Sequence, residues 1–210
     1  MAVRTCLARK PCRMKTLRSP RCTLEPQVEA HAAEMYPVLC DPAIYEYEGV
    51  PPPSLVKLAN GLRRRESRVS PDGREQWLNW VVRLPSGKLC GYVQATVYEN
   101  GAAYIAYEFA SMYWRQGIGN SAVLRMLEEL RDSFSVHTFV AVLKAANFRS
   151  MGLLLKLGFK PGTTEDAGST APNLMKSLWS CQQAQWVLHP HPATPHSPSL
   201  GRSANGRTAC

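Results

Sequence analysis

Residues 113–120 read Tyr-Trp-Arg-Gln-Gly-Ile-Gly-Asn, and the interpretation of the whole chain starts from this stretch. It lies between an apolar run, residues 102–110, and a segment with helical spacing that begins at Ser121. This pattern predicts a strand-to-helix turn. Glycines in such a turn let the backbone approach a ligand closely, and the first N–H groups of the helix, together with its dipole, favour a phosphate.

A second motif strengthens this interpretation, because two spaced glycines alone occur in many ordinary turns. Residues 147–159 read Asn-Phe-Arg-Ser-Met-Gly-Leu-Leu-Leu-Lys-Leu-Gly-Phe. Together, the two motifs resemble the acyl-CoA-binding motifs of the GNAT superfamily of N-acetyltransferases. Gly117 and Gly119 occupy the glycine places of the pattern Gln/Arg-x-x-Gly-x-Gly/Ala, whose first place holds Trp114 here.

Within this superfamily the chain resembles the Rim-type branch, the ribosomal-protein alanine N-acetyltransferases. Tyr113 and Trp114 before the glycines have the form found in that branch, and residues 147–159 fit its Asn-x-x-Ser…Leu-Gly-Phe signature. The resemblance extends over about residues 17–178 and is strongest over residues 103–159.

Two departures from the family pattern lie in the turn itself. Arg115 stands where a small residue is usual, and Asn120 and Ser121 replace the common Thr-Glu pair. Neither departure removes the glycines.

The resemblance implies a binding site for acetyl-CoA as cosubstrate. In the family, backbone amides of the turn hold the pyrophosphate. The preceding strand separates from its neighbour, and its freed N–H groups bind the pantetheine arm and the thioester oxygen, as in an oxyanion hole. Asn147 is where the family places a side-chain amide on the cofactor, and it equally fits a helix N-cap. The residues expected to bind acetyl-CoA are Phe109, Ala110, Arg115, Gln116, Gly117, Ile118, Gly119, Asn120 and Asn147.

Ser150 and Glu108 are the expected catalytic residues. Many GNAT enzymes use a tyrosine of the fourth helix as general acid, but this chain has Leu153 and Leu154 there. Ser150 is the hydroxyl that the Rim-type branch would use to protonate the departing thiolate, or else it packs near the cofactor without a proton role. Glu108 is the only carboxylate on the strand before the turn. It could act as base through a water, unless strand alternation points it to solvent.

The basic excess of the chain belongs to its ends. The formal net charge is +9, and residues 1–22 carry seven Arg or Lys and no acid, whereas residues 182–210 add two arginines. Residues 1–16 are expected to be a disordered basic leader, although organelle transit peptides share this composition and Met14 could be the true translation start. Arginines without interleaved aromatics do not favour a nucleic-acid partner.

Composition favours one cytoplasmic domain without a membrane or metal partner. No apolar run approaches the roughly 20 residues needed to cross a bilayer. The seven cysteines are an odd number without a Cys-x-x-Cys pair, which favours a reducing compartment over a disulfide framework or a zinc site. Residues 17–181 are expected to form the domain. The Pro-, His- and Ser-rich residues 182–210 are expected to be a disordered tail.

Hydrophobic periodicity predicts an α+β fold, a mixed and mainly antiparallel sheet flanked by helices, which agrees with the family fold. Three consecutive antiparallel strands precede the turn, and a strand-helix-strand-helix half includes it. Helices are expected at residues 28–39, 55–68 (capped by Ser54), 119–132 and 147–157. Strands are expected at residues 23–26, 75–84, 89–98, 102–109, 138–143, 159–161 and 174–178.

We therefore expect an acetyl-CoA-dependent N-acetyltransferase that acts on a primary amine by direct attack in a ternary complex. The acceptor would be a protein N-terminus or a small amino compound. Glu46 and Glu48, in the region that borders the acceptor in the family, could attract a cationic acceptor or be mere surface charges. A catalytically silent acyl-CoA-binding module is the alternative, and a ribosome- or RNA-associated protein is a third. Homodimers are common in the family.

Overall fold

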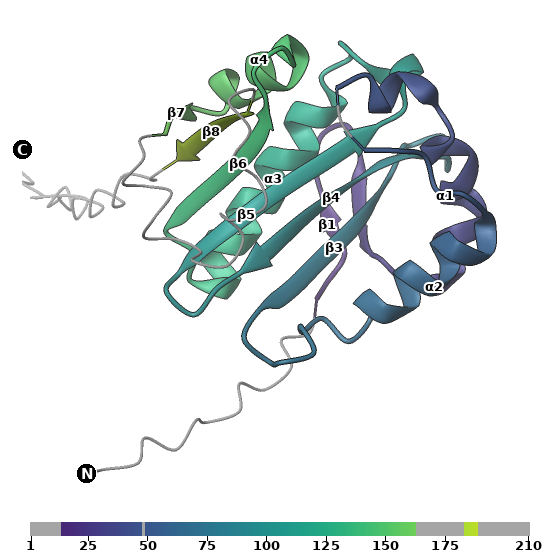
Figure 1. Ribbon diagram of the computed structural model, residues 1–210, viewed down its shortest axis with the longest axis horizontal. Helices are drawn as coiled ribbons and strands as arrows, with labels where there is room; N and C mark the ends of the chain where they lie inside the picture. Colours follow the sequence, from purple (N-terminus) through teal and green to yellow (C-terminus); the bar gives the residue numbers. More distant parts are fainter. Residues whose placement is uncertain (1–13, 48, 163–182, 189–210) are drawn as a thin grey trace, which may run out of the picture.

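The computed structural model describes residues 14–47, 49–162 and 183–188, which form one eight-stranded sheet with helices on both faces (Figure 1). The strand order is β1-β2-β3-β4-β5-β6-β8-β7, and every neighbouring pair is antiparallel except β5 and β6. The strands are β1 (Leu17–Arg18), β2 (Thr23–Pro26), β3 (Gln76–Arg83), β4 (Leu89–Val97), β5 (Ala102–Phe109), β6 (Thr138–Lys144), β7 (Lys160–Pro161) and β8 (Gln183–Leu188).

The segment between β2 and β3 covers one face of the sheet. The helix expected at residues 28–39 is divided into a 3-10 turn and an α-helix, and the expected second helix ends at Arg65 rather than at Arg68, which has a positive φ of 61°. Ser54 caps that helix as predicted, because its Oγ accepts the N–H of Lys57 at 3.2 Å. The elements are η1 (Glu29–His31), α1 (Ala32–Leu39), η2 (Pro42–Tyr45) and α2 (Leu55–Arg65).

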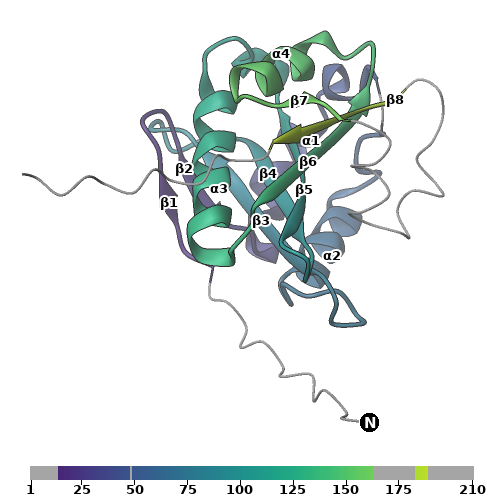
Figure 2. The same ribbon diagram turned by 90° about the vertical axis from the view of Figure 1, so that its left-hand side faces the viewer.

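The opposite face carries η3 (Ser111–Tyr113), α3 (Ile118–Phe134) and α4 (Phe148–Lys156). Figure 2 shows α3 and α2 on opposite sides of the sheet. Apolar residues of α3 recur every three or four positions, so one stripe of the helix faces the sheet and joins the larger buried cluster. That stripe includes Ala122, Val123, Met126, Leu127 and Leu130, all of them buried; the spacing of Val123, Leu127 and Leu130 predicted such a face.

β5 pairs with β4 over more residues than it pairs with β6. The antiparallel ladder with β4 continues to the pair Gly91 and Phe109, whereas the parallel ladder with β6 ends at the pair Ile105 and Ala141. The last four residues of β5 therefore lie beyond the ladder with β6, and the two strands separate just before the glycine turn. This is the separation that the family resemblance implies.

The end of the sheet differs from the expectation. The strand expected at residues 174–178 lies outside the described residues. The structure has a strand, β8, in the segment that was assigned to the disordered tail. β8 pairs with both β6 and β7, and Trp186 and Val187 are buried in the core. The assignment followed the Pro- and His-rich composition that begins at residue 189, and it overlooked the short apolar run before it.

The beginning of the domain also requires a correction. Residues 14–16, assigned to the leader, are held against the sheet and α3. The Trp80 indole N–H donates to the Lys15 carbonyl at 3.2 Å, and Lys15 Nζ lies 3.1 Å from Glu129 Oε1. The Met14 side chain packs against the larger core cluster. Residues 1–13 lie outside the described part of the chain.

Candidate active site

The glycine turn leaves the first N–H groups of α3 free of helical partners. Gly117 precedes the helix with a φ of +76°, a left-handed conformation that glycine adopts without a Cβ penalty. The first helical bond runs from the Ser121 N–H to the Gly117 carbonyl at 3.1 Å. Within the described chain, no backbone acceptor receives the N–H groups of Ile118, Gly119 or Asn120. These donors and the dipole of a 17-residue helix form an anion-binding end.

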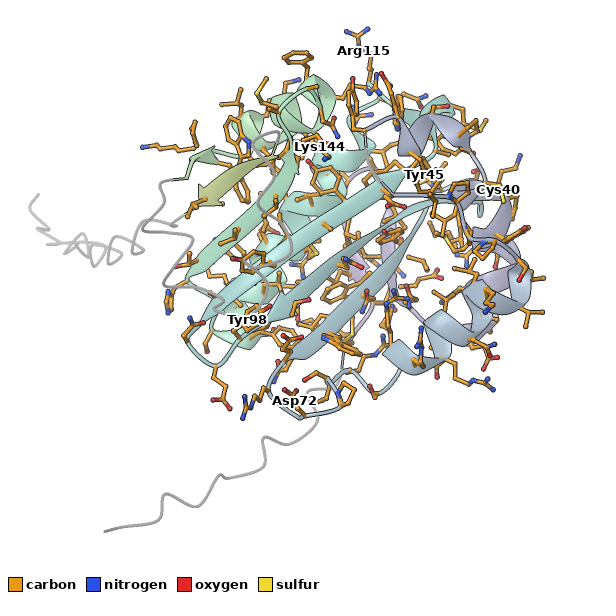
Figure 3. All side chains as sticks on the ribbon, viewed as in Figure 1. Cys40, Tyr45, Asp72, Tyr98, Arg115 and Lys144 are labelled. Atoms are coloured by element: carbon orange, nitrogen blue, oxygen red, sulfur yellow. The ribbon has the colours of Figure 1, made fainter. Side chains whose placement is uncertain are left out.

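The two polar residues of the turn itself point away from this end. Arg115 has a φ of +61°, which explains why a small residue is usual at this position, and it extends outward in Figure 3. Gln116 is exposed, and its amide donates to the Met112 carbonyl at 2.8 Å. The side chains of these two residues are therefore not directed at the helix end that was expected to hold a phosphate.

Arg21, from the β1–β2 hairpin, is a cation that sequence reasoning missed. A Cβ placed on Gly117 would lie 3.2 Å from Arg21 Nε, so the exposed guanidinium stands directly beside the turn. The hairpin is tied to α3 nearby, because Ser121 Oγ donates to Ser19 Oγ at 3.1 Å. Arg21 was assigned to the basic excess of the N-terminus, since no local pattern links it to the glycines.

The separated end of β5 presents backbone groups to the space left by β6. The Ala110 N–H donates to the Cys90 carbonyl at 3.0 Å, and the Tyr98 N–H donates to the Ala102 carbonyl at 2.9 Å. Even-numbered residues of β5 thus bond to β4, and strand alternation directs the N–H groups of Tyr107 and Phe109 to the open side. The expectation for Ala110 is corrected, because its N–H is not freed.

Phe109 is fixed by the residues around it. Its carbonyl accepts the Trp114 indole N–H at 2.7 Å, which gives the tryptophan before the glycines a structural role. Gly91 lies directly below, where a Cβ would approach the Glu108 carbonyl oxygen to 2.1 Å. The ring also lies 3.4 Å from where a Cβ on Gly119 would be. The free Phe109 N–H is therefore held on a rigid strand.

Ser150 is contacted by Tyr107 from β5 and by Asn147 at the start of its own helix. The Asn147 side-chain oxygen accepts the Ser150 N–H at 3.0 Å, so Asn147 is a helix N-cap and its NH₂ group remains available for another acceptor. The Tyr107 hydroxyl donates to the Ser150 carbonyl at 3.3 Å. Burial raises the pKa of Tyr107 to about 12, so the phenol stays protonated at neutral pH.

Glu108 faces the other side of β5, toward α1 and α2. It is half-buried in the cleft and bonds to the hydroxyl of Tyr92, its cross-strand partner. Burial first, and then the negative charge of Glu108, raises the pKa of Tyr92 well above its usual value, and the same two causes raise the pKa of Tyr45. Glu108 therefore does not point to open solvent; two protonated tyrosines stand beside it.

Arg149 links the start of α4 to the 42–47 segment over the cleft. Its guanidinium lies 4.4 Å from the ring centre of Trp114 and 5.3 Å from that of Tyr47, and it pairs with Glu46. This pairing lowers the pKa of Glu46 and raises that of Arg149. Glu46 is thus partnered within the chain, which weakens the expectation that it attracts a cationic acceptor. Glu48 lies outside the described residues.

One cleft of about 810 Å³ is lined by Tyr107, Glu108, Phe109, Trp114, Arg115, Gly117, Gly119, Asn120, Asn147, Arg149 and Ser150, whereas Arg21, Gln116, Glu46 and Tyr92 are not among its lining residues. It contains residues from both sides of β5, from the turn, from α4 and from the 42–47 segment. Figure 3 places Tyr45, Arg115 and Lys144 toward the same end of the sheet, opposite Tyr98 and Asp72. In the described part of the chain, no three His, Cys, Asp or Glu side chains gather as a metal site would require, and no helix is long and apolar enough to cross a membrane.

Comparisons with known proteins agree with this geometry. The model of an acetyltransferase (GNAT) domain matches residues 21–160. The uncharacterized N-acetyltransferase p20 of Bacillus licheniformis is 27% identical over 160 residues, 73% of this chain and 87% of that protein.

Solved structures share the fold. RimL, the ribosomal L7/L12 alpha-N-protein acetyltransferase in complex with coenzyme A, has a TM-score of 0.68 at 12% identity, covering 83% of this chain and 98% of its own. MccE, the microcin C7 self immunity acetyltransferase in complex with acetyl-CoA and AMP, has a TM-score of 0.66 at 18% identity, covering 87% and 99%. They confirm the mixed α+β fold expected from the sequence.

Proposed function

The chain belongs to the GNAT family and is an acetyl-CoA-dependent N-acetyltransferase, and we propose that it acetylates a primary amine by direct attack in a ternary complex. The acceptor is a protein N-terminus or a small amino compound. RimL acts on a ribosomal protein, and MccE is named for immunity to a microcin. Neither relative narrows the acceptor of this chain.

One observation carries the proposal: a separated strand end and an unbonded helix N-terminus open into the same cleft. The free N–H groups at Ile118, Gly119 and Asn120, with Arg21 beside them, suit a pyrophosphate. The free N–H groups of Tyr107 and Phe109 suit an extended, amide-containing arm. The donors present thus fit the phosphate and pantetheine parts of acetyl-CoA.

When bound, acetyl-CoA supplies an activated acetyl group as a thioester. The Phe109 N–H then donates to the thioester oxygen and stabilises the negative charge that develops there. Ser150 would donate a proton to the departing sulfur and recover one from solvent, and Tyr107 would hold the backbone of Ser150 through its hydrogen bond to the Ser150 carbonyl. Asn147 orients the cofactor with its free NH₂ group.

Glu108 serves as the base on the opposite face of β5. It takes a proton from the incoming amine, directly or through a water, while the Tyr92 hydroxyl keeps its carboxylate oriented. In this arrangement the acceptor approaches from the α2 side, and the cofactor from the α3 side. Both reactants meet at the separated end of β5, so no covalent enzyme intermediate is needed.

The test is thermal unfolding with and without acetyl-CoA, for the wild type and for Gly117→Glu. A ligand at about 100 times its dissociation constant stabilises a fold by roughly 2.7 kcal/mol. We expect a clear rise in the melting temperature of the wild type. The variant should show none, because its carboxylate occupies the cradle and repels phosphate. The absence of any shift at millimolar acetyl-CoA would contradict the proposal.

A further inference from the structure

A second cleft, of about 680 Å³, lies on the α2 face of the sheet, where the C-terminal end of α2 passes over β3 and β4. It is lined by two arginines, several hydroxyl and amide side chains, and no aspartate or glutamate. The polar lining residues are Arg64, Arg65, Ser67, Ser70, Asn79, Gln94 and Thr96. Such a lining favours an anion over a cation or an apolar ligand.

The floor of this cleft holds hydrogen-bonding groups without partners. Asn79 is only 4% exposed, and its side chain makes no hydrogen bond within the described residues. None of its amide atoms is both fully buried and unpartnered, so the amide reaches the solvent of the cleft, where a ligand or a water can bond to it. Gln94, its cross-strand neighbour, and Thr96 also lack side-chain hydrogen bonds to described residues.

The arginines over this floor are not neutralised by the chain. Neither Arg64 nor Arg65 forms an ion pair with a described carboxylate, whereas Arg63, on the same helix, bonds to Asn60 and lies 3.8 Å from Glu29. Arg68 does not line the cleft; its guanidinium donates to the Gln27 carbonyl, and its Nη1 is buried without an acceptor among the described residues. The nearby carboxylates accept hydrogen bonds, and Asp72 and Glu75 accept them from residues that line the cleft, so their negative charges stand beside it. Glu66 accepts the Glu29 N–H, Glu75 accepts the Trp77 indole N–H, and Asp72 accepts from Ser70.

The second cleft meets the active-site cleft on this face. Gln94 lines the second cleft, and Ala106, its exposed partner on β5, lines the first. Residues two apart on a strand are separated by about 7 Å, and neighbouring strands by about 5 Å. Gln94 and Thr96 therefore lie roughly 8 to 14 Å from Glu108.

We propose that this second cleft binds an anionic group, a carboxylate or a phosphate, and that the amine acceptor carries it. This inference rests on the proposed function, because it takes the acceptor amine to lie beside Glu108. An acceptor of this class has its primary amine and its anion roughly 8 to 14 Å apart. A peptide with a free N-terminus and an acidic third residue spans about that distance, at about 3.4 Å per residue plus the side chain.

The experiment compares acetyl transfer to two peptides that differ only at the third residue, glutamate against glutamine. For the wild type we expect kcat/KM to be about tenfold higher for the glutamate peptide, which corresponds to roughly 1.4 kcal/mol. In the Arg64→Gln/Arg65→Gln variant, that ratio should fall to about one. Raised salt should lower the wild-type ratio, because both arginines are exposed.

Arg63→Gln is the matched control. It removes one positive charge from the same helix where the double variant removes two, so losses are compared per charge removed; Arg63 lies outside the cleft, and its variant should leave the ratio unchanged. An equal loss per charge in both variants would mean that only the general positive charge of α2 matters, and it would overturn the site. An unchanged ratio in the double variant would overturn it as well.

A thermal-shift experiment with inorganic phosphate distinguishes a free anion in the second cleft from an anion that the acceptor carries. If a free anion rather than the acceptor occupies the cleft, phosphate should raise the melting temperature of the wild type but not of the double variant, and the peptide ratio should stay near one. That outcome would support an anion site and overturn its link to the acceptor. Thermal shifts with acetyl-CoA on the same samples test the proposed function separately, because neither arginine lies near the glycine turn.

Discussion

Arg21 lies against the backbone of Gly117, so a cation stands beside the helix end that would hold a phosphate. Other single side chains also determine which groups are available in the active-site cleft. The Trp114 indole N–H donates to the Phe109 carbonyl, and the Tyr107 hydroxyl donates to the Ser150 carbonyl. Each contact joins a group from the sheet to one from a loop or helix.

Arg21→Gln is expected to weaken acetyl-CoA binding about fivefold. A charged hydrogen bond contributes roughly 1.5–3 kcal/mol, and the exposure of Arg21 reduces this to about 1 kcal/mol. Calorimetric titration would measure the dissociation constant. Arg18→Gln is the control, because Arg18 is exposed on the same hairpin. An equal effect of both variants would show that only the total charge of the hairpin matters.

Ser150→Ala is expected to lower kcat about a hundredfold or more, because general acids contribute roughly 10²–10⁴ to the rate. The thermal shift with acetyl-CoA should remain, since the backbone donors are untouched. Steady-state kinetics at saturating acetyl-CoA would measure the change. Unchanged kcat would favour the alternative that Ser150 only packs near the cofactor.

At the scale of elements, α4 has both a structural and a proposed binding role at its first turn. Asn147 caps the helix through its oxygen, and Arg149 joins the same turn to the 42–47 segment over the cleft. The stability of α4 and the shape of the cleft therefore depend on adjacent residues. Substitutions at the cap can separate the two roles.

Asn147→Ala should lower the free energy of unfolding by about 1 kcal/mol, because the Ser150 N–H loses its acceptor. Asn147→Ser keeps a capping oxygen but loses the NH₂ group. We expect it to retain most of the stability and still to weaken acetyl-CoA binding. Urea denaturation and calorimetric titration on both variants would test this. Wild-type affinity in the serine variant would confine Asn147 to the capping role.

At the scale of the whole molecule, β8 completes the sheet on the far side of β6. Trp186 lies opposite Ala141 and Pro161, with 6% of its surface exposed, in the larger core cluster. Residues 183–188 therefore belong to the folded unit and not to a dispensable tail. This placement has a direct consequence for stability.

Trp186→Ala is expected to lower the free energy of unfolding by roughly 3–5 kcal/mol, the usual cost of emptying a buried aromatic site. Leu155→Ala is the control, because Leu155 is 54% exposed and should cost less than about 0.5 kcal/mol. Urea denaturation would measure both. Similar small losses for the two variants would remove β8 from the core.

Local patterns in the sequence predicted most of the elements. Residues 102–109 form β5 as expected, Ser54 and Asn147 cap their helices, and α3 buries the residues that its spacing indicated. Such features depend on neighbours within a turn or a strand, and the residue order records them. The glycine turn was recognisable for the same reason.

Contacts between distant segments could not be read in this way. No periodicity indicated that Arg21 would reach Gly117, that Tyr107 would meet Ser150, or that Arg149 would pair with Glu46. The free N–H groups of β5 exist only because its two ladders end at different residues. The sequence by itself thus determined the elements, the glycine turn and the family resemblance. The packed sheet decided which side chains share a cleft, because it brings segments together over distances that local propensity does not encode.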